Sequence, residues 1–100
     1  MRIVRVIGKL TLSRAHPSVV GARWLIAVPL HLEDVAGAAA AGDESLVVYD
    51  ELAAGEGMLL AVSEGAEASA PFHPDSKPLD AYAAAILDRV WLRPEDFPPA

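Results

Sequence analysis

Short segments in which apolar and polar residues alternate recur along the chain, and this spacing is typical of half-buried β-strands. We expect four such strands, at residues 2–13, 23–32, 46–50 and 58–63. Glycine, proline and small polar residues separate them, as in turns. In the first predicted strand one face carries Val4, Val6, Leu10 and Leu12, and Gly8 marks a bulge or bend.

The next predicted strands have apolar faces of the same kind. Pro29 has no N–H to donate, so we expect it at a sheet edge or a bulge. In the fourth strand Met58, Leu60 and Val62 share one face. The shared face of the second strand is formed by Trp24, Ile26, Val28, Leu30 and Leu32.

The C-terminal part predicts a helix and then a fifth strand. Residues 79–90 are typical of a helix, with Ser76 as N-cap, Pro78 in the first turn and Asp80 near the positive end of the helix dipole. Residues 89–93 follow as the last strand, and the proline-rich residues 94–100 form a tail. We therefore expect one domain over residues 1–93, a mainly β, small closed barrel with one short α-helix near the C-terminus.

The composition favours association and gives no sign of an enzyme. The apolar fraction of 53% is high for a domain of 100 residues. We interpret the excess as apolar surface that a partner covers. The chain has no cysteine, which excludes disulfides and thiolate metal sites. His16, His31 and His73 lack metal-ligand spacing, and no serine lies in a nucleophile elbow.

The net charge is −6, which argues against nucleic acid as a partner. The charge is unevenly distributed. Residues 1–32 contain no carboxylate, whereas residues 33–100 contain all fourteen of them and only Lys77, Arg89 and Arg93 as basic residues. Two interpretations stay open: the oppositely charged halves meet across subunits, or the fold intermixes them within one chain.

No segment predicts contact with a membrane. The longest apolar stretch, residues 19–32, is interrupted by Arg23 and Pro29 and is too short to span a bilayer. Arg5 and Lys9 interrupt the apolar N-terminus, so it does not resemble a signal peptide. We therefore expect a cytoplasmic protein.

The stretch DELAAGEGMLLAVSEGAEA, residues 50–68, is either a loop that binds a ligand or a loop that packs subunits together. Its glycines do not form a phosphate-binding loop, because the Lys and Ser/Thr that follow the last glycine of such a loop are missing. Gly55, Gly57 and Gly65 are better explained by tight turns with positive φ.

This stretch, extended to YDELAAGEGMLLAVSEGAEA and followed by KPLDAYAAAILDRV, resembles the EutN/CcmL family of pentameric vertex proteins in bacterial microcompartment shells. The family has an Asp, a Gly-Ala-Gly turn, an apolar strand, a second Gly-containing turn that ends in Arg, and a Pro-Val-Asp-Ala segment. The opening, MRIVRVIGKLTLSRAHPSVVGARWLIAVPL, is similar too. The resemblance covers Met1 to about Leu92.

Two departures from the family pattern affect specific positions. Ala53 replaces the first glycine of the Gly-Ala-Gly turn, so we expect that this position no longer needs a positive φ. Ser69 replaces the arginine of the second turn, so any edge contact made by that arginine must differ here.

The resemblance implies an OB-like five-stranded barrel that assembles as a cyclic homopentamer, a structural shell protein without enzyme activity, metal or cofactor. The pentamer would cap a vertex of the shell and contact hexameric shell proteins. A loop at the fivefold axis or pore would contain Ala53, Ala54, Gly55 and Glu56. The edge facing the hexamers would contain Ser13, Arg14, His16, Gly65, Ala66 and Glu67.

Two alternatives stay open. One is a soluble pentamer of the same fold that binds a small anion or a scaffold peptide. The other is a monomeric OB-like barrel that binds single-stranded nucleic acid or a small anion. Nucleic-acid-binding barrels use basic grooves and aromatic platforms, and here only Trp24, Tyr49 and Trp91 lie on predicted strands.

Overall fold

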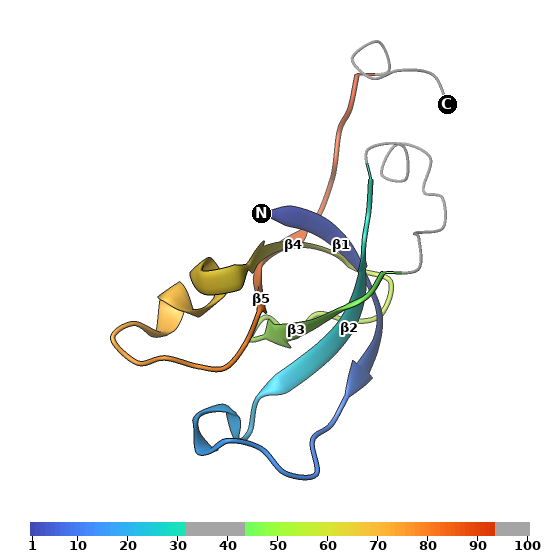
Figure 1. Cartoon of the computed structure of the whole chain (residues 1–100). Helices are drawn as coiled ribbons and strands as arrows, with labels where there is room; N and C mark the ends of the chain where they lie inside the picture. Colours follow the sequence, from blue (N-terminus) through green and yellow to red (C-terminus); the bar gives the residue numbers. More distant parts are fainter. Residues whose placement is uncertain (32–43, 94–100) are drawn as a thin grey trace.

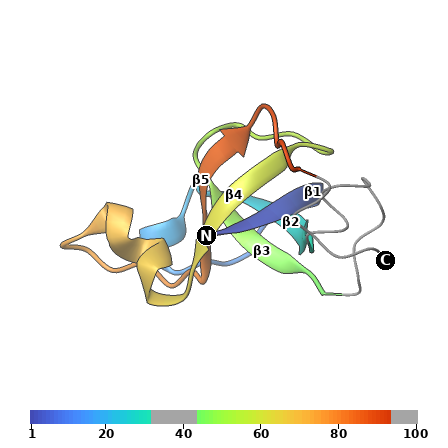
Figure 2. The same cartoon turned by 90° about the horizontal axis from the view of Figure 1, so that it is seen from above.

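Five strands close into a barrel in the computed structural model, which describes residues 1–31 and 44–93 (Figures 1 and 2). The order around the barrel is β1, β2, β3, β5, β4. The elements are β1 (Arg2–Leu10), η1 (Pro17–Val19), β2 (Arg23–Pro29), β3 (Leu46–Asp50), β4 (Leu59–Glu64), η2 (Gly65–Phe72) and β5 (Ala81–Leu87), where η denotes a 3₁₀-helix. This architecture confirms the predicted five-stranded barrel.

The strands pair antiparallel, except that β3 and β5 run parallel. β1 pairs with both β2 and β4, so the N-terminal strand is enclosed on both edges. Its register against β2 shifts between Val6 and Gly8. This irregularity is the bulge expected at Gly8, and such bulges increase the local twist that helps a sheet to close.

Apolar side chains that point inward form the main core. Val4 and Val6 of β1 and Leu60 and Val62 of β4 are 0–1% exposed, as their alternation predicted. Every strand contributes to this core, so its burial links all five strands. The other members are Leu25, Ala27, Val48, Ala54, Ala81 and Ala83.

The apolar face predicted for β2 is not the one that points into the main core. Leu25 and Ala27 point into the main core, whereas Ile26 and Val28 are half-buried. Trp24 is buried in a separate cluster. Both faces of β2 are apolar, so alternation alone could not indicate which face points inward.

Two other residues predicted to face the core lie outside the strands and are more exposed than expected. Met58 precedes β4, and its side chain is 43% exposed. Leu12 lies beyond the end of β1 and is 45% exposed. The predicted position of Leu32 falls outside the described residues.

The α-helix predicted at residues 79–90 is wrong, because residues 81–87 form β5. β5 pairs with β4 and meets β3 at Tyr82 and Tyr49, so it closes the barrel. Helix propensity differs by at most about 1 kcal/mol per residue among residues other than proline. The strand ladder and the burial of Ala81 and Ala83 outweigh that preference. The longest helix among the described residues is η2, which precedes β5.

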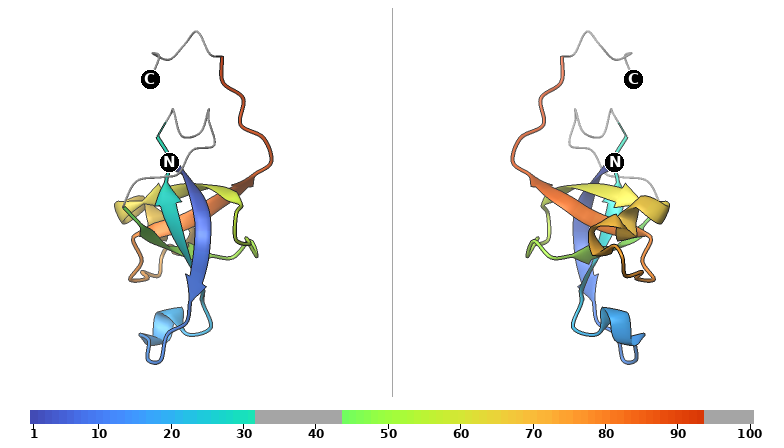
Figure 3. Two further views of the ribbon diagram at one scale, coloured as in Figure 1. Left: turned by 90° about the vertical axis from the view of Figure 1, so that its right-hand side faces the viewer. Right: turned by 90° about the vertical axis from the view of Figure 1, so that its left-hand side faces the viewer.

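Residues 89–93, predicted as the last strand, belong to none of the five strands and run away from the barrel (Figures 1 and 3). The predicted tail at 94–100 falls outside the described residues. Within residues 1–31 and 44–93, no helix has the length and apolar character needed to cross a membrane.

Candidate functional site

An aromatic cluster attaches η2 and the β1–β2 connection to the barrel. The ring of Tyr49 lies 5.3 Å from that of Trp24, 5.2 Å from Phe72 and 6.2 Å from Tyr82, measured between centroids. Lys77 Nζ lies 4.9 Å from the ring centroid of Phe72. We call this group, together with its buried neighbours, the aromatic cluster; the buried neighbours are Val19, Ala68 and Leu79.

The residues predicted to form the hexamer-facing edge are exposed and lie in two segments, the β1–β2 connection and the first turn of η2, which we call the two edge turns. Val19 follows the first turn and Ala68 belongs to the second, and both pack in the aromatic cluster. The two turns therefore pack against one aromatic cluster on the same side of the barrel. The exposed edge residues are Ser13, Arg14 and His16 in the first turn and Gly65, Ala66 and Glu67 in the second.

His16 has a local structural partner. Its Nδ1 accepts a hydrogen bond from Ser18 N at 3.1 Å and lies 2.7 Å from the Ser18 hydroxyl. His16 thereby caps η1. Among the described residues, no group of three or more His, Asp or Glu side chains is placed to hold a metal ion.

Asp50, the last residue of β3, anchors the loop of residues 51–58. Its side chain is fully buried and accepts hydrogen bonds from Leu52 N at 2.9 Å, Ala54 N at 2.9 Å and Arg23 Nε at 3.0 Å. Arg23 also donates to the carbonyl oxygen of Ala54. These donors offset the cost of burying the carboxylate.

The predicted sites did not include the Asp50–Arg23 pair. A local signal was present, because an Asp that follows an apolar strand and precedes a turn often accepts bonds from backbone N–H groups two residues on. The arginine partner lies 27 positions earlier in the chain. No spacing rule in the sequence identifies such a distant partner.

The residues predicted at the fivefold axis are not all on the surface. Ala53 and Glu56 are exposed and Gly55 is partly exposed, whereas Ala54 is fully buried in the main core. The loop and the adjacent strands enclose a cavity of about 290 Å³. Lys9, Arg23 and Glu56 line it. Because Arg23 is bound to Asp50 and Glu56 adds a negative charge, the cavity does not favour the small-anion alternative.

Ala53 keeps a positive φ of 60°, so the expectation that this position no longer needs one is wrong. The Asp50 side chain binds the backbone N–H groups of Leu52 and Ala54, on either side of Ala53. These bonds fix the backbone in the left-handed region whatever the side chain. An alanine there is strained relative to glycine.

We expect Ala53→Gly to raise the free energy of unfolding by roughly 0.5–1 kcal/mol. The free energy of the strain that alanine has in the left-handed region is larger than the free energy that glycine costs through its extra loss of backbone entropy on folding. Urea unfolding at fixed protein concentration measures the difference. Ala54→Gly is the matched control, and it should destabilise the protein because Ala54 is buried at negative φ. A less stable Ala53→Gly variant would contradict the strain argument.

The hydroxyl of Tyr82 donates a 2.7 Å hydrogen bond to Glu51 Oε1 and joins β5 to the same loop. This bond, together with partial burial and the charge of Glu51, raises the pKa of Tyr82 from 10.0 to about 12. The raised pKa means that the folded state favours the neutral phenol. The stabilisation is therefore complete below pH 10 and is lost as the pH rises through 12.

An ultraviolet absorbance titration of the phenolate tests this assignment. The Tyr82 component of the wild-type curve should ionise near pH 12, shift to lower pH in Glu51→Gln and be missing in Tyr82→Phe. Identical titration curves for wild type and Glu51→Gln would show that the Glu51 bond does not control the Tyr82 pKa.

The chain was compared with known families and structures. The family model described as ethanolamine utilisation protein EutN/carboxysome matches residues 1–88. The GrpN pentameric microcompartment shell protein from Rhodospirillum rubrum is 25% identical, with a TM-score of 0.76 over 93% of this chain and 100% of that chain. CcmL from Gloeobacter violaceus is 27% identical, with a TM-score of 0.79 over 92% and 90% of the two chains.

More distant structures share the fold. EutN from Escherichia coli is 18% identical, with a TM-score of 0.75 over 92% of this chain and 89% of that chain. Among curated proteins, no sequence matches this chain significantly.

Proposed function

The chain belongs to the family of EutN and carboxysome proteins, and on that premise we propose that it is a structural component of a bacterial microcompartment shell. Five copies form a ring, and the ring closes a vertex of the shell within the bacterial cytoplasm. The observation that carries this proposal is the similarity to the GrpN pentameric shell protein along the whole of that chain, at 25% identity. The role requires no catalytic group, metal or cofactor.

A pentamer has a geometric purpose in such a shell. Six-sided units alone tile a flat layer, and five-sided units introduce the curvature that closes it. A ring of five copies requires a head-to-tail contact, in which one surface of a subunit binds a different surface of the next. We propose hexameric shell proteins as the partners around the outer edge of this ring.

We assign two surfaces of the subunit to these contacts. The two exposed turns beside the aromatic cluster form the edge toward the hexamers, with Arg14 in one turn and Glu67 in the other. The loop anchored by Asp50 faces the fivefold axis. In that loop Ala53, Gly55 and Glu56 present surface, while Ala54 supports the loop from the core.

Shell formation with and without the chain tests the proposed function. The hexameric shell proteins of the same cell are produced together with a fluorescent cargo, and the particles are examined by electron microscopy. With the chain we expect closed polyhedra that retain cargo, and without it open particles that lose cargo. Equal closure in both samples would overturn the vertex role.

Charge reversal in the edge turns tests the edge assignment. Arg14→Glu or Glu67→Lys should impair shell closure and leave the ring intact, because both side chains are exposed in the free subunit. Closure is scored by electron microscopy and the ring by native mass spectrometry. Asp75→Lys, a reversal of an exposed charge outside the two turns, is the matched control. Normal shells from both edge variants would count against the assignment.

The alternative of a barrel that binds single-stranded nucleic acid gains no support. Stacking platforms for bases need exposed aromatic rings and a basic groove. Trp24 and Tyr49 are 8% and 7% exposed and pack against each other in the aromatic cluster. The net charge of −6 also opposes binding to phosphate groups.

A further inference from the structure

The chain leaves the barrel after β5 as an extended segment, residues 88–93, which we call the arm (Figure 1). The arm begins where the family match ends, at residue 88. It belongs to no strand of the described barrel. Trp91 on the arm is 74% exposed. A large aromatic side chain on an unpaired segment is the kind of residue that anchors protein interfaces.

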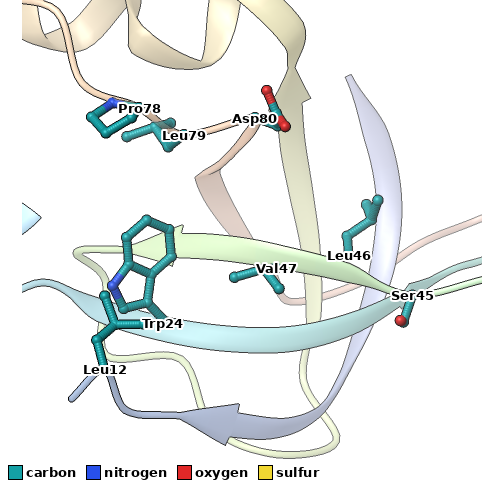
Figure 4. Close-up of a pocket in the computed structure, with 8 residues that line it drawn as sticks. All are labelled: Leu12, Trp24, Ser45, Leu46, Val47, Pro78, Leu79 and Asp80. Atoms are coloured by element: carbon teal, nitrogen blue, oxygen red, sulfur yellow. The ribbon is translucent and has the colours of Figure 1, made fainter. Parts of the chain in front are cut away.

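An apolar groove with a volume of about 450 Å³ lies beside the aromatic cluster (Figure 4). Its lining includes the exposed Leu12 and Val47 and the buried Trp24 and Leu79, and Asp80 lies at its rim. Val47 is 47% exposed although it is a strand residue. Trp24 Nε1 is buried and has no hydrogen-bond acceptor in the described chain. A buried N–H without an acceptor is uncommon in folded proteins.

The arm and the groove lie at opposite ends of β5. Leu79 and Asp80 precede this strand, and the arm follows it. The strand has seven residues, which corresponds to about 23 Å at 3.3 Å per residue. Figures 1 and 3 show the arm rising away from the end of the barrel where the β1–β2 connection, which supplies Leu12, is drawn. The arm therefore points away from the groove of its own chain.

The charges of the arm and the groove are complementary. Arg89 lies two residues before Trp91, so in an extended segment both side chains point to the same side. Arg89 and Asp80 are exposed. Within residues 1–31 and 44–93, neither side chain has a hydrogen bond or an ion pair. A segment bound in the groove with Trp91 on the apolar surface can place Arg89 toward the rim.

We propose that the arm of one copy binds in the groove of the neighbouring copy. Trp91 packs on Val47 and Leu79 of that neighbour, and Arg89 pairs with its Asp80. Such a contact is head-to-tail, because it joins opposite ends of two identical subunits, and it closes into a ring when the rotation between subunits allows. The inference rests on the proposed pentamer and identifies how its subunits are joined.

Cysteine cross-linking tests the contact directly, because the chain has no cysteine of its own. Full-length Arg89→Cys and Asp80→Cys chains with different tags are co-expressed, purified and oxidised, so that the anchoring Trp91 is kept. We expect a disulfide-linked dimer that contains both tags. The double variant should form covalent chains of up to five copies. Ile7→Cys replaces Asp80→Cys in the matched control, because Ile7 is exposed but does not line the groove. The control pair should not cross-link.

Ring stability gives a second readout. Trp91→Ala should raise the concentration at which the ring dissociates at least tenfold, as expected for an anchoring aromatic residue, whereas Asp88→Ala should change it little. If wild type forms a ring but the 89–80 cysteine pair does not cross-link, or forms disulfides only within one chain, the arm contact is overturned and the shell function is left intact. If Trp91→Ala leaves the stability of the ring unchanged but its shells fail to close, the proposed contact between copies is wrong, and the arm binds a hexamer instead. A monomeric wild type would overturn the proposed pentamer itself.

Discussion

Replacement of Asp50 by alanine is expected to lower the free energy of unfolding by about 3 kcal/mol, because each buried donor that loses its acceptor costs about 1–3 kcal/mol. The change leaves the backbone N–H groups of Leu52 and Ala54 without their acceptor. It also leaves Arg23 without its carboxylate partner. In a domain of this size the loss corresponds to a decrease in Tm of about 15 °C. The loop of residues 51–58, which we place at the fivefold axis, loses its anchor.

Thermal unfolding at fixed protein concentration measures this effect, since dissociation of an oligomer makes Tm depend on concentration. Glu51→Ala is the matched control, because it removes the neighbouring carboxylate, which is exposed and bonds to Tyr82. The control should cost less than about 1 kcal/mol. Asp50→Asn keeps part of the hydrogen bonding and should lie between the two. Equal losses for Asp50→Ala and Glu51→Ala would refute the anchoring role.

Replacement of Tyr49 by alanine should destabilise the protein by about 3–5 kcal/mol, as for other large aromatic side chains removed from a core. Tyr49 is 7% exposed and contacts the rings of Trp24, Phe72 and Tyr82. Lys77 also lies 5.7 Å from its ring centroid. The variant removes the centre of the aromatic cluster, through which η2 packs on the barrel.

Urea unfolding and hydrogen exchange together test this prediction. Tyr49→Phe keeps the ring and should cost less than about 1.5 kcal/mol. In Tyr49→Ala the amides of residues 65–79 should lose more protection than those of β1 and β2, which are paired over many residues outside the cluster. An equal loss of protection throughout the barrel would show that the cluster does not specifically hold η2.

The strands that could be predicted are those whose local pattern agrees with their environment. In β1 and β4 one face is apolar at every second position, and the inward residues Val4, Val6, Leu60 and Val62 are those that the alternation indicated. The bulge near Gly8 was predicted for the same reason, since glycine interrupts the pattern there. A small barrel follows from strands of this length separated by turns.

The errors arise where tertiary contacts overrule local preference. Residues 81–87 are rich in alanine, so their own propensity favours a helix. They form a strand because β3 and β4 each have an edge with which this segment pairs. In β2 the apolar residues on both faces conceal the inward one. The pairing of Asp50 with Arg23 depends on the register of β2 against β3, which no local pattern encodes.

The assignment of residues to an edge and to an axis stays a prediction, but part of its structural setting could be predicted. The six edge residues are all exposed, as a contact surface requires, three in the β1–β2 connection and three in the first turn of η2. In the loop at residues 53–56 the structure places Ala54 in the core and keeps Ala53 at positive φ, and both features follow from the bonds of the buried Asp50. Exposure of Trp91 on an arm outside the barrel could not be predicted, because residues 89–93 have the pattern of a strand.

The native mass of the purified wild-type protein tests the central claim most directly. Native mass spectrometry, or light scattering after size exclusion, is carried out over a range of protein concentrations. We expect a species of five chains of 10.5 kDa each. A monomer at all concentrations, or a ring with another number of copies, would contradict the vertex role, because only a five-sided unit fits a vertex in a shell of six-sided units.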